Sequence, residues 1–191
     1  MKKLISKSFL TAAIAMLSFS IANAAAPIQF TFFDFNAPQD SEVTGVRFPA
    51  IYGKGGGDIR GVDFGLLSYS EMNSLRGAAI SFLPTANRIK GEMTGISWSL
   101  FNWHEGQDTG WNAGVVNNTH NVKGLNSGVV NFSDGYTVVD LGLVNISQKS
   151  NFQLSAVNVT QELDGVQIGF VNCAKNGFLP CFIIFNFGSS K

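Results

Sequence analysis

The segment 101–111 carries the side chains of this chain that are best suited to chemistry. It reads Phe-Asn-Trp-His-Glu-Gly-Gln-Asp-Thr-Gly-Trp. His104, Glu105 and Asp108 belong to the residue types that ligate metals or transfer protons, and the two flanking tryptophans could stack on a sugar ring. In a strand, however, the adjacent His104 and Glu105 would point to opposite sides. We interpret the segment as a solvated loop with anchoring tryptophans. The alternative is a binding site formed by Trp103, His104, Glu105, Asp108 and Trp111.

Two other motifs carry less chemistry. The stretch 53–58, Gly-Lys-Gly-Gly-Gly-Asp, lacks the Lys-Ser/Thr ending of a phosphate-binding loop and precedes no helical pattern, so it predicts a turn. His120 has serines nearby, but no Gly-x-Ser-x-Gly nucleophile motif occurs in the chain. The sequence therefore predicts no catalytic residue, no metal site and no cofactor.

Composition bounds the class of protein. The 191 residues include 13 basic and 13 acidic side chains, and only 14% are charged, against a typical value of about 25%. A nucleic-acid-binding protein needs a dense basic surface, so we expect no nucleic-acid partner. Two cysteines are too few for a four-cysteine zinc site or a disulfide scaffold. The length is that of a single domain.

Residues 1–24 have the pattern of a secretory signal peptide. Lys2, Lys3 and Lys7 precede the apolar run 9–21, and Ala-Asn-Ala at 22–24 is a small-residue cleavage site. Cleavage would leave 25–191 with 10 basic and 13 acidic residues, a formal charge of −3. We therefore expect an exported protein of the periplasm, outer membrane or cell surface.

The exported part is a tandem repeat. Its template is Gly, apolar, any, apolar or small, Gly, apolar, apolar, Asn. The clearest copies are Gly110-Trp-Asn-Ala-Gly-Val-Val-Asn117, Gly124-Leu-Asn-Ser-Gly-Val-Val-Asn131 and Gly165-Val-Gln-Ile-Gly-Phe-Val-Asn172. Nine copies begin at 45, 61, 77, 91, 110, 124, 138, 151 and 165. The longest step, from 91 to 110, contains the segment 101–111, and an insertion of this kind usually forms a loop on one face.

Within each copy, apolar and polar residues alternate, which is typical of a half-buried strand. We therefore predict one all-β domain over 25–191, with nine repeats over 43–173. We favour a β-solenoid of about 14 residues per coil, because stacking would place recurrent asparagines in a hydrogen-bonded ladder. These are Asn117, Asn131, Asn145, Asn158 and Asn172. The alternative is an up-and-down antiparallel β-sheet or β-barrel, because a straight eight-residue strand leaves too few residues for a return.

The two ends of the array predict caps. The aromatic segment 25–42 matches no repeat and predicts an N-terminal cap strand, and 174–191 predicts a C-terminal hairpin. Asn176-Gly177 is a tight-turn signal, with Cys173 and Cys181 almost symmetrical about it. Because exported chains meet oxidising conditions, we predict a disulfide between these cysteines.

The tandem motif Gly-Val-Gln-Ile-Gly-Phe-Val-Asn172, followed by Ala174-Lys-Asn-Gly177 and Phe-Ile-Ile-Phe-Asn-Phe187, resembles the bacterial surface-repeat proteins first named from Leptospira. The resemblance is strongest over 110–187. The early copies depart from it, with Pro84 and Trp98 at the asparagine position. What it implies is an exported, envelope-associated or surface protein of unassigned activity, and the family offers no catalytic residues to carry over.

Three functions follow from the sequence. The first is a non-enzymatic structural or binding protein of a Gram-negative envelope, whose partner could be an envelope glycan or another surface protein. The second is an outer-membrane β-barrel, with the apolar side of each strand against lipid. The third is a glycan-active enzyme that uses the segment 101–111.

Overall fold

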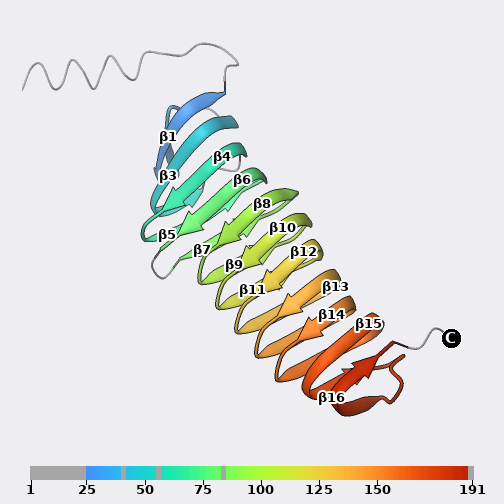
Figure 1. Ribbon diagram of the computed structural model, residues 1–191. Coiled ribbons are helices and arrows are strands. Elements are labelled where there is room, and N and C mark those ends of the chain that lie inside the picture. Colours follow the sequence, from blue (N-terminus) through green and yellow to red (C-terminus); the bar gives the residue numbers. More distant parts are fainter. Residues whose placement is uncertain (1–24, 40–41, 55–56, 83–84, 189–191) are drawn as a thin grey trace, which may run out of the picture.

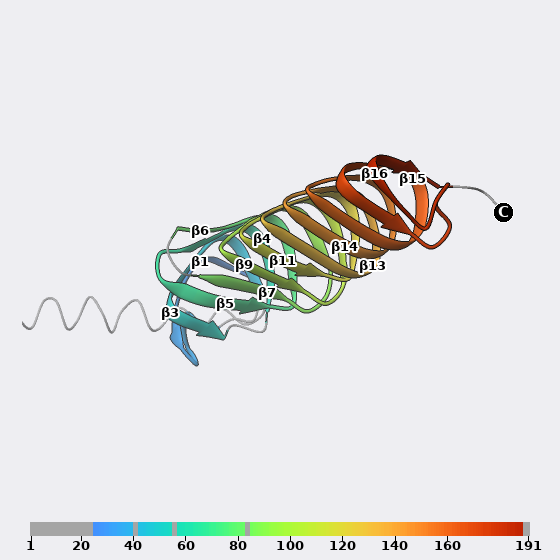
Figure 2. The same cartoon turned by 90° about the horizontal axis from the view of Figure 1, so that it is seen from below.

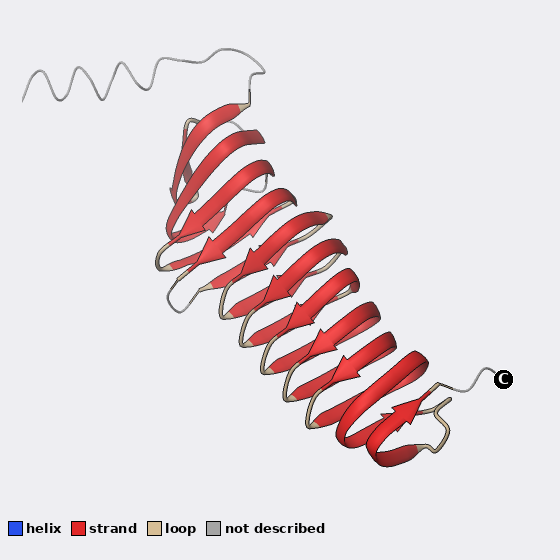
Figure 3. Ribbon diagram, in the orientation of Figure 1, coloured by secondary structure: helices blue, strands red, loops and turns tan. Residues whose placement is uncertain are grey.

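The chain folds into a stack of parallel β-coils, a β-solenoid of about nine turns about 15 residues apart. The computed structural model describes residues 25–39, 42–54, 57–82 and 85–188. Strands and short turns build the stack, and the described residues contain no helix (Figure 3). The predicted all-β solenoid is confirmed, and the antiparallel alternative is wrong, because successive coils pair in parallel.

Each coil crosses two sheet faces (Figure 1). The first face contains β1 (Ala26–Phe33), β4 (Asp58–Gly65), β6 (Ser74–Ser81), β8 (Met93–Trp98), β10 (Gln107–Ala113) and β12 (Asn121–Ser127). The second face contains β5 (Ser68–Met72), β7 (Ala86–Ile89), β9 (Phe101–His104) and β11 (Val116–Thr119). Longer strands bend and belong to both faces: β3 (Glu42–Lys54), β13 (Val130–Leu141), β14 (Val144–Leu154) and β15 (Val157–Ala174).

The two faces join at two different edges. We call the turn from the first face to the second the corner; it contains Gly114-Val115, Gly128-Val129 and Gly142-Leu143. We call the arc from the second face into the next coil the polar edge; it contains Glu105, His120, Asp134, Gln148 and Gln161. Figure 3 shows the corner turns as one row along the stack, and Figure 2 shows the stack from below.

The asparagines of the repeat lie inside the stack, directly behind the corner. Each amide nitrogen donates to the amide oxygen of the next coil, as in Asn117 to Asn131 at 2.7 Å and Asn131 to Asn145 at 2.8 Å. The ladder continues through Asn158 to Asn172 at 2.8 Å. Each nitrogen also donates to a backbone carbonyl of the next coil, such as Ser127 O at 3.0 Å from Asn117. An amide fits here because it offers two donors and one acceptor.

The corner glycine leaves the space that this asparagine occupies. A Cβ on Gly128 would lie 2.9 Å from Nδ2 of Asn117 and 2.7 Å from the carbonyl oxygen of Gly114. A Cβ on Gly142 would meet Asn145 Oδ1 at 2.9 Å. The Gly-x-x-Asn spacing of the repeat is therefore a packing requirement between a side-chain-free turn and a stacked amide.

A second row of glycines lies within the first face. Gly61, Gly77, Gly95 and Gly110 have φ between +134° and +144°, a region that residues with a Cβ rarely adopt. A Cβ on Gly95 would lie 1.9 Å from the carbonyl oxygen of Gly77. Backbone approaches backbone closely along this row, and any larger residue would separate the coils.

The interior of most coils is polar, and the outside is apolar. Inward positions of the first face carry Asn112, Asn126, Asp140, Gln153 and Gln167, each at most 1% exposed. Their strand neighbours Leu125, Val139 and Phe152 point outward. The alternation predicted from the sequence is present, but the polar side of the strand is the buried one.

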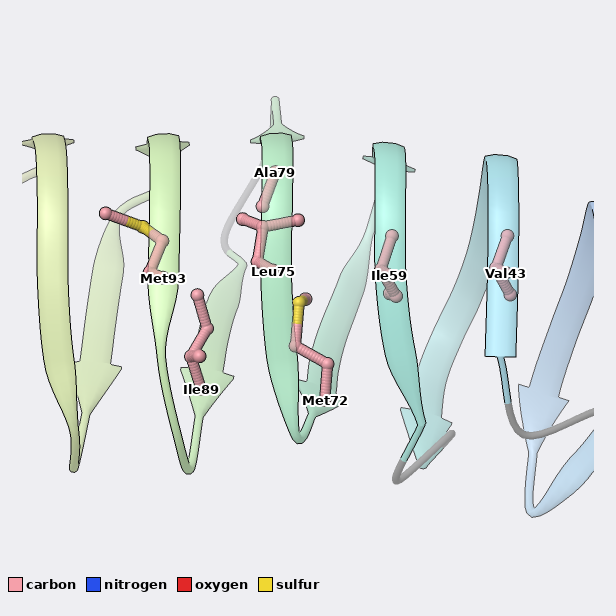
Figure 4. Packing of buried hydrophobic residues seen from close by; sticks show 7 residues of the cluster. All are labelled: Val43, Ile59, Met72, Leu75, Ala79, Ile89 and Met93. Carbon is pink, nitrogen blue, oxygen red and sulfur yellow. The ribbon is translucent and has the colours of Figure 1, made fainter. Parts of the chain in front are cut away.

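A contiguous apolar core lies in the first coils, and further along the same inward row Val122 and Leu163 are buried singly among polar residues. Val43, Ile59, Leu75 and Met93 stack along the first face, and Met72 and Ile89 face them from the second (Figure 4). The next position in the same inward row of the first face is Asp108, which pairs with Met93. The interior thus changes from hydrocarbon to hydrogen-bonded polar groups along the axis.

The register of the early coils corrects the sequence reading. Gly95 pairs with Gly77 and Gly110, so Gly95 begins this copy and Gly91 does not. The long step is therefore the 18 residues from 77 to 95, and not the step containing 101–111. The asparagine positions are Asn87 and Asn102, which pair with one another. Trp98 lies in β8, and Pro84 lies outside the described residues.

Both ends of the stack are covered. At the start, β2 (Phe35–Ala37) pairs antiparallel with β1, which itself pairs in parallel with β3. At the end, β16 (Cys181–Phe187) pairs antiparallel with β15. The predicted disulfide joins Cys173 and Cys181. The predicted signal peptide, 1–24, lies outside the described residues.

Candidate functional site

The segment 101–111 is not a loop. Phe101–His104 forms β9 on the second face and Gln107–Ala113 forms β10 on the first face, with a short turn between them. Both strands pair with the coils before and after them. The prediction of a solvated loop is wrong, because this coil has nearly the common length and its residues complete the stack.

The two sides of the coil wall separate the five candidate residues. His104 and Asp108 point inward and are 2% and 0% exposed. Trp103, Glu105 and Trp111 point outward, with Trp103 on the second face and Trp111 on the first. Because the wall lies between the two groups, the structure does not bring the five side chains into one binding site.

His104 and Asp108 belong to a polar cluster inside the stack. His104 Nδ1 lies 2.7 Å from Asp108 Oδ2, and Asn112 Nδ2 donates to the same oxygen at 2.7 Å. His104 Nε2, Asp108 Oδ1 and Asn112 Oδ1 have no hydrogen-bond partner in the described structure. A substrate could reach these atoms only by opening the coils, so the contact serves to orient the two side chains inside the stack.

A buried ion pair lies among the apolar coils. Arg47 Nε donates to Asp63 Oδ1 at 2.6 Å, and Arg47 also donates to Ser70 Oγ and to the carbonyl oxygen of Glu71. Ser70 donates to the other Asp63 oxygen at 2.5 Å. All charged atoms of the pair are satisfied by protein groups, so this cluster is structural.

Asp140 is the buried acid with no basic partner in its hydrogen bonds. Thr137, Gln153 and Asn126 donate to its oxygens at 2.5, 3.3 and 3.3 Å. Burial raises the pKa of the Asp140 carboxyl above its ordinary value of 3.8, and the three hydrogen bonds offset this in part. The Asp140 side chain is 1% exposed and lies in the interior of the stack.

The outward Trp103 belongs to a charged network on the second face. The guanidinium of Arg88 lies 5.0 Å from its ring centroid and donates to Glu105 at 2.6 Å. Glu71 bridges Arg88 and Lys90, with the Lys90 contact at 2.6 Å. The hydrogen bond from Lys90 lowers the pKa of Glu71, and that to Glu105 raises the pKa of Arg88. The two basic side chains, Arg88 and Lys90, therefore balance the charge of the two acidic ones, Glu71 and Glu105.

The outer surface carries an apolar band that runs along the stack. The band consists of the two outward rows of the first face, the corner, and the first outward row of the second face. Its corner row is Leu66, Phe82, Leu100, Val115, Val129, Leu143, Ala156 and Phe170. Leu143 is 58% exposed and Phe170 is 79% exposed. In the described coils, none of these four rows carries a charged residue.

Aromatic rings concentrate in one part of this band. Phe64 and Phe82 are tilted against each other with ring centroids 5.4 Å apart, and Phe82 and Trp98 meet edge to face at 5.1 Å. Phe82, Trp98, Leu100 and Val115 line a shallow groove of about 430 Å³ beside the corner glycines. In the sequence, an aromatic residue recurs three positions after a glycine of the row within the first face, at positions 48, 64 and 98. This recurrence was the signal for the aromatic part of the band.

Charged side chains gather at the polar edge instead. Lys149 contacts Glu162 at 2.7 Å and Asp164 at 2.9 Å across neighbouring coils. His120 lies 2.7 Å from Asp134. The pKa of Lys149 is raised by its two carboxylate partners. The cross-section of the solenoid is therefore amphipathic, with an apolar corner opposite a polar edge of mixed charge.

In the described ranges, no group of three or more His, Cys, Asp and Glu side chains could hold a metal ion. No helix in the same ranges is long and apolar enough to cross a membrane. The chain matches no protein-family model, no curated protein and no solved structure with which it was compared.

Proposed function

We propose that this chain is an exported, non-enzymatic protein of a bacterial envelope that acts by binding through its apolar band. The observation that carries the proposal is the inverted distribution of side chains. A soluble monomer rarely exposes a contiguous apolar patch larger than a few hundred Å², whereas here apolar rows run along the stack from coil to coil.

The sequence features support the same proposal. The signal-peptide pattern at 1–24 predicts export, and the Cys173–Cys181 disulfide suits an oxidising compartment. The resemblance to bacterial surface-repeat proteins also favours the envelope. The geometry gives little support to a glycan-active enzyme, because His104 and Asp108 are enclosed while Trp103 and Trp111 lie on different faces.

Cell fractionation tests this proposal. The protein, expressed from its complete coding sequence in a Gram-negative host, is expected in the envelope fraction after lysis. High salt should leave it there, since the band carries no charge, and a mild detergent should release it. Recovery in the soluble fraction without detergent would contradict the proposal.

A further inference from the structure

The shape of the apolar band restricts what can cover it. The interior lies between the two faces, so the faces are turned away from each other and meet at the corner. The band therefore wraps a convex ridge. A second copy of this chain, which presents the same convex ridge, could cover only one face at a time. A fluid phase of acyl chains covers both faces and the corner together.

The depth of the band matches one leaflet of a bilayer. On the first face it extends four residues, from the row of Leu125 to the corner row of Val129, or about 13 Å at ~3.3 Å per residue. Half of a bilayer's hydrocarbon core is about 15 Å thick. From the coil of Leu100 onward, a solenoid lying flat could therefore immerse the first-face part of the band without a charged residue of the second face or the polar edge entering the hydrocarbon. In the two earlier coils, Glu71 and Arg88 lie within this depth on the second face.

The backbone within the band is already hydrogen-bonded. At the corner, the amide of Val129 donates to the carbonyl oxygen of Val115 and that of Leu143 donates to Val129, both at 3.0 Å. A backbone N–H or C=O group without a hydrogen-bond partner is strongly unfavourable in contact with lipid. Because the pairing between coils gives these groups their partners, the band does not carry this cost. Trp111 has its indole N–H bonded to Ser127 Oγ at 2.6 Å, so that side chain is satisfied as well.

The polar edge carries both signs of charge in pairs between coils. Such an edge suits the zwitterionic headgroup region and needs no anionic lipid, in contrast to a polybasic surface. From the convex band, its depth, its satisfied backbone and this opposite edge, we infer that the partner is a lipid bilayer. The solenoid lies in the plane of the membrane with its corner immersed in one leaflet.

This inference rests on the proposed function and names its partner. It is tested by flotation with vesicles of phosphatidylcholine alone. The protein is purified after expression from its complete coding sequence, so that the cell performs any processing. One variant carries Val129→Lys and Leu143→Lys at the corner. The matched control carries Gln107→Lys and Gln148→Lys, two exposed positions toward the polar edge. Circular dichroism verifies that both variants retain the β-structure of the parent protein.

The parent protein and the edge variant are expected to float with the vesicles. The corner variant should lose partitioning by roughly tenfold for each lysine. Failure of the parent protein to float, or an equal loss in both variants, would overturn the inference. If the parent protein instead forms a dimer that the corner lysines dissociate, and does not float, the partner is a second copy. The proposed function then survives while the lipid inference fails, and a soluble cell fraction would contradict both.

Discussion

The ladder asparagines use both amide hydrogens and the amide oxygen. Asn131 accepts from Asn117 and donates to Asn145 and to the carbonyl oxygen of Leu141. A carboxylate has no donor and a hydroxyl has only one, so neither could replace the amide. This side chain links three coils and gives a second donor to the carbonyl oxygen of Leu141, which also accepts from the amide of Gly128 at 3.0 Å.

The buried Arg47–Asp63 pair gives the first residue-scale prediction. Asp63→Ala leaves Arg47 enclosed without its carboxylate, and should lower the free energy of unfolding by about 3–5 kcal/mol. The control is Glu42→Ala, which removes the exposed partner of Arg60 and should cost about 1 kcal/mol or less. Urea unfolding followed by circular dichroism measures both.

A double variant separates pairing from packing. Arg47→Met with Asp63→Leu removes both charges and should cost less than Asp63→Ala alone, since no unpaired charge remains. If the loss of unfolding free energy in the double variant equals the sum of the losses in the two single variants, the two side chains act independently.

Asp140 gives a pH-dependent prediction. Its folded-state pKa is raised above 3.8 by burial, so the folded state binds the proton more tightly than the unfolded chain does. The contribution of this group to stability is therefore fully present below pH 3.8 and is lost as the pH rises through the raised pKa.

Asp140→Asn removes this titration. The unfolding free energy of the parent protein, minus that of the variant, should fall as the pH is increased from about 4 to 8. Chemical denaturation at a series of pH values provides the measurement. A difference that stays constant over this interval would contradict the burial argument.

At the scale of the repeat unit, the ladder predicts unequal effects of two leucine substitutions. Asn145→Leu removes the donor and acceptor that connect Asn131 with Asn158, and should destabilise the protein by roughly 2–4 kcal/mol. Gln148→Leu changes an exposed side chain at the polar edge and should change stability by about 0.5 kcal/mol or less. Equal shifts in melting temperature would contradict the ladder.

The glycine row of the first face predicts a steric effect. Gly95→Ala places a Cβ against the carbonyl of Gly77 at φ +134°, and should cost about 2 kcal/mol or more. The adjacent Thr94→Ala is the control, because Thr94 is exposed on the same strand and should be nearly neutral. Comparable unfolding midpoints for the two variants would show that the coils can separate freely at Gly95.

The repeat unit also shows what the sequence could predict. The alternation in β12 and the recurrence of Asn131 and Asn145 predicted strands stacked in register, and the structure confirms both. The sequence could not show which side of each strand faces the interior, because alternation of apolar and polar residues is compatible with either side being buried. Hydrophobicity alone favours the wrong side here, since the buried face is satisfied by hydrogen bonds between coils that no single repeat contains.

The register errors have a local cause. Gly91 and Gly95 are four residues apart, which is the spacing of the two glycines in the template, and only pairing with Gly77 selects Gly95 as the first of them. The misplaced register moved the apparent insertion to 101–111 and made His104 look exposed. His104 and Asp108 are four residues apart across a turn, so their contact through the interior depends on the bend of the coil.

At the scale of the whole molecule, the two edges of the solenoid differ in kind. The corner is apolar along the stack, and the polar edge carries ion pairs between coils. The interior changes from an apolar cluster at Ile59 and Met93 to the asparagine and glutamine rows. Hydrogen-bonded polar groups in the interior hold the stack together, so the outward rows need not be polar. The apolar band therefore stays on the surface, available for binding.

Depth-dependent quenching of tryptophan fluorescence tests the central claim most directly. One variant keeps only Trp98, in the apolar band, with Trp103→Phe and Trp111→Phe. A second has all three native tryptophans replaced by phenylalanine and carries His120→Trp at the polar edge. In vesicles with brominated acyl chains, the account predicts strong quenching of Trp98 and little quenching at position 120. Equal quenching at the two positions, or none at Trp98, would contradict immersion of the apolar corner.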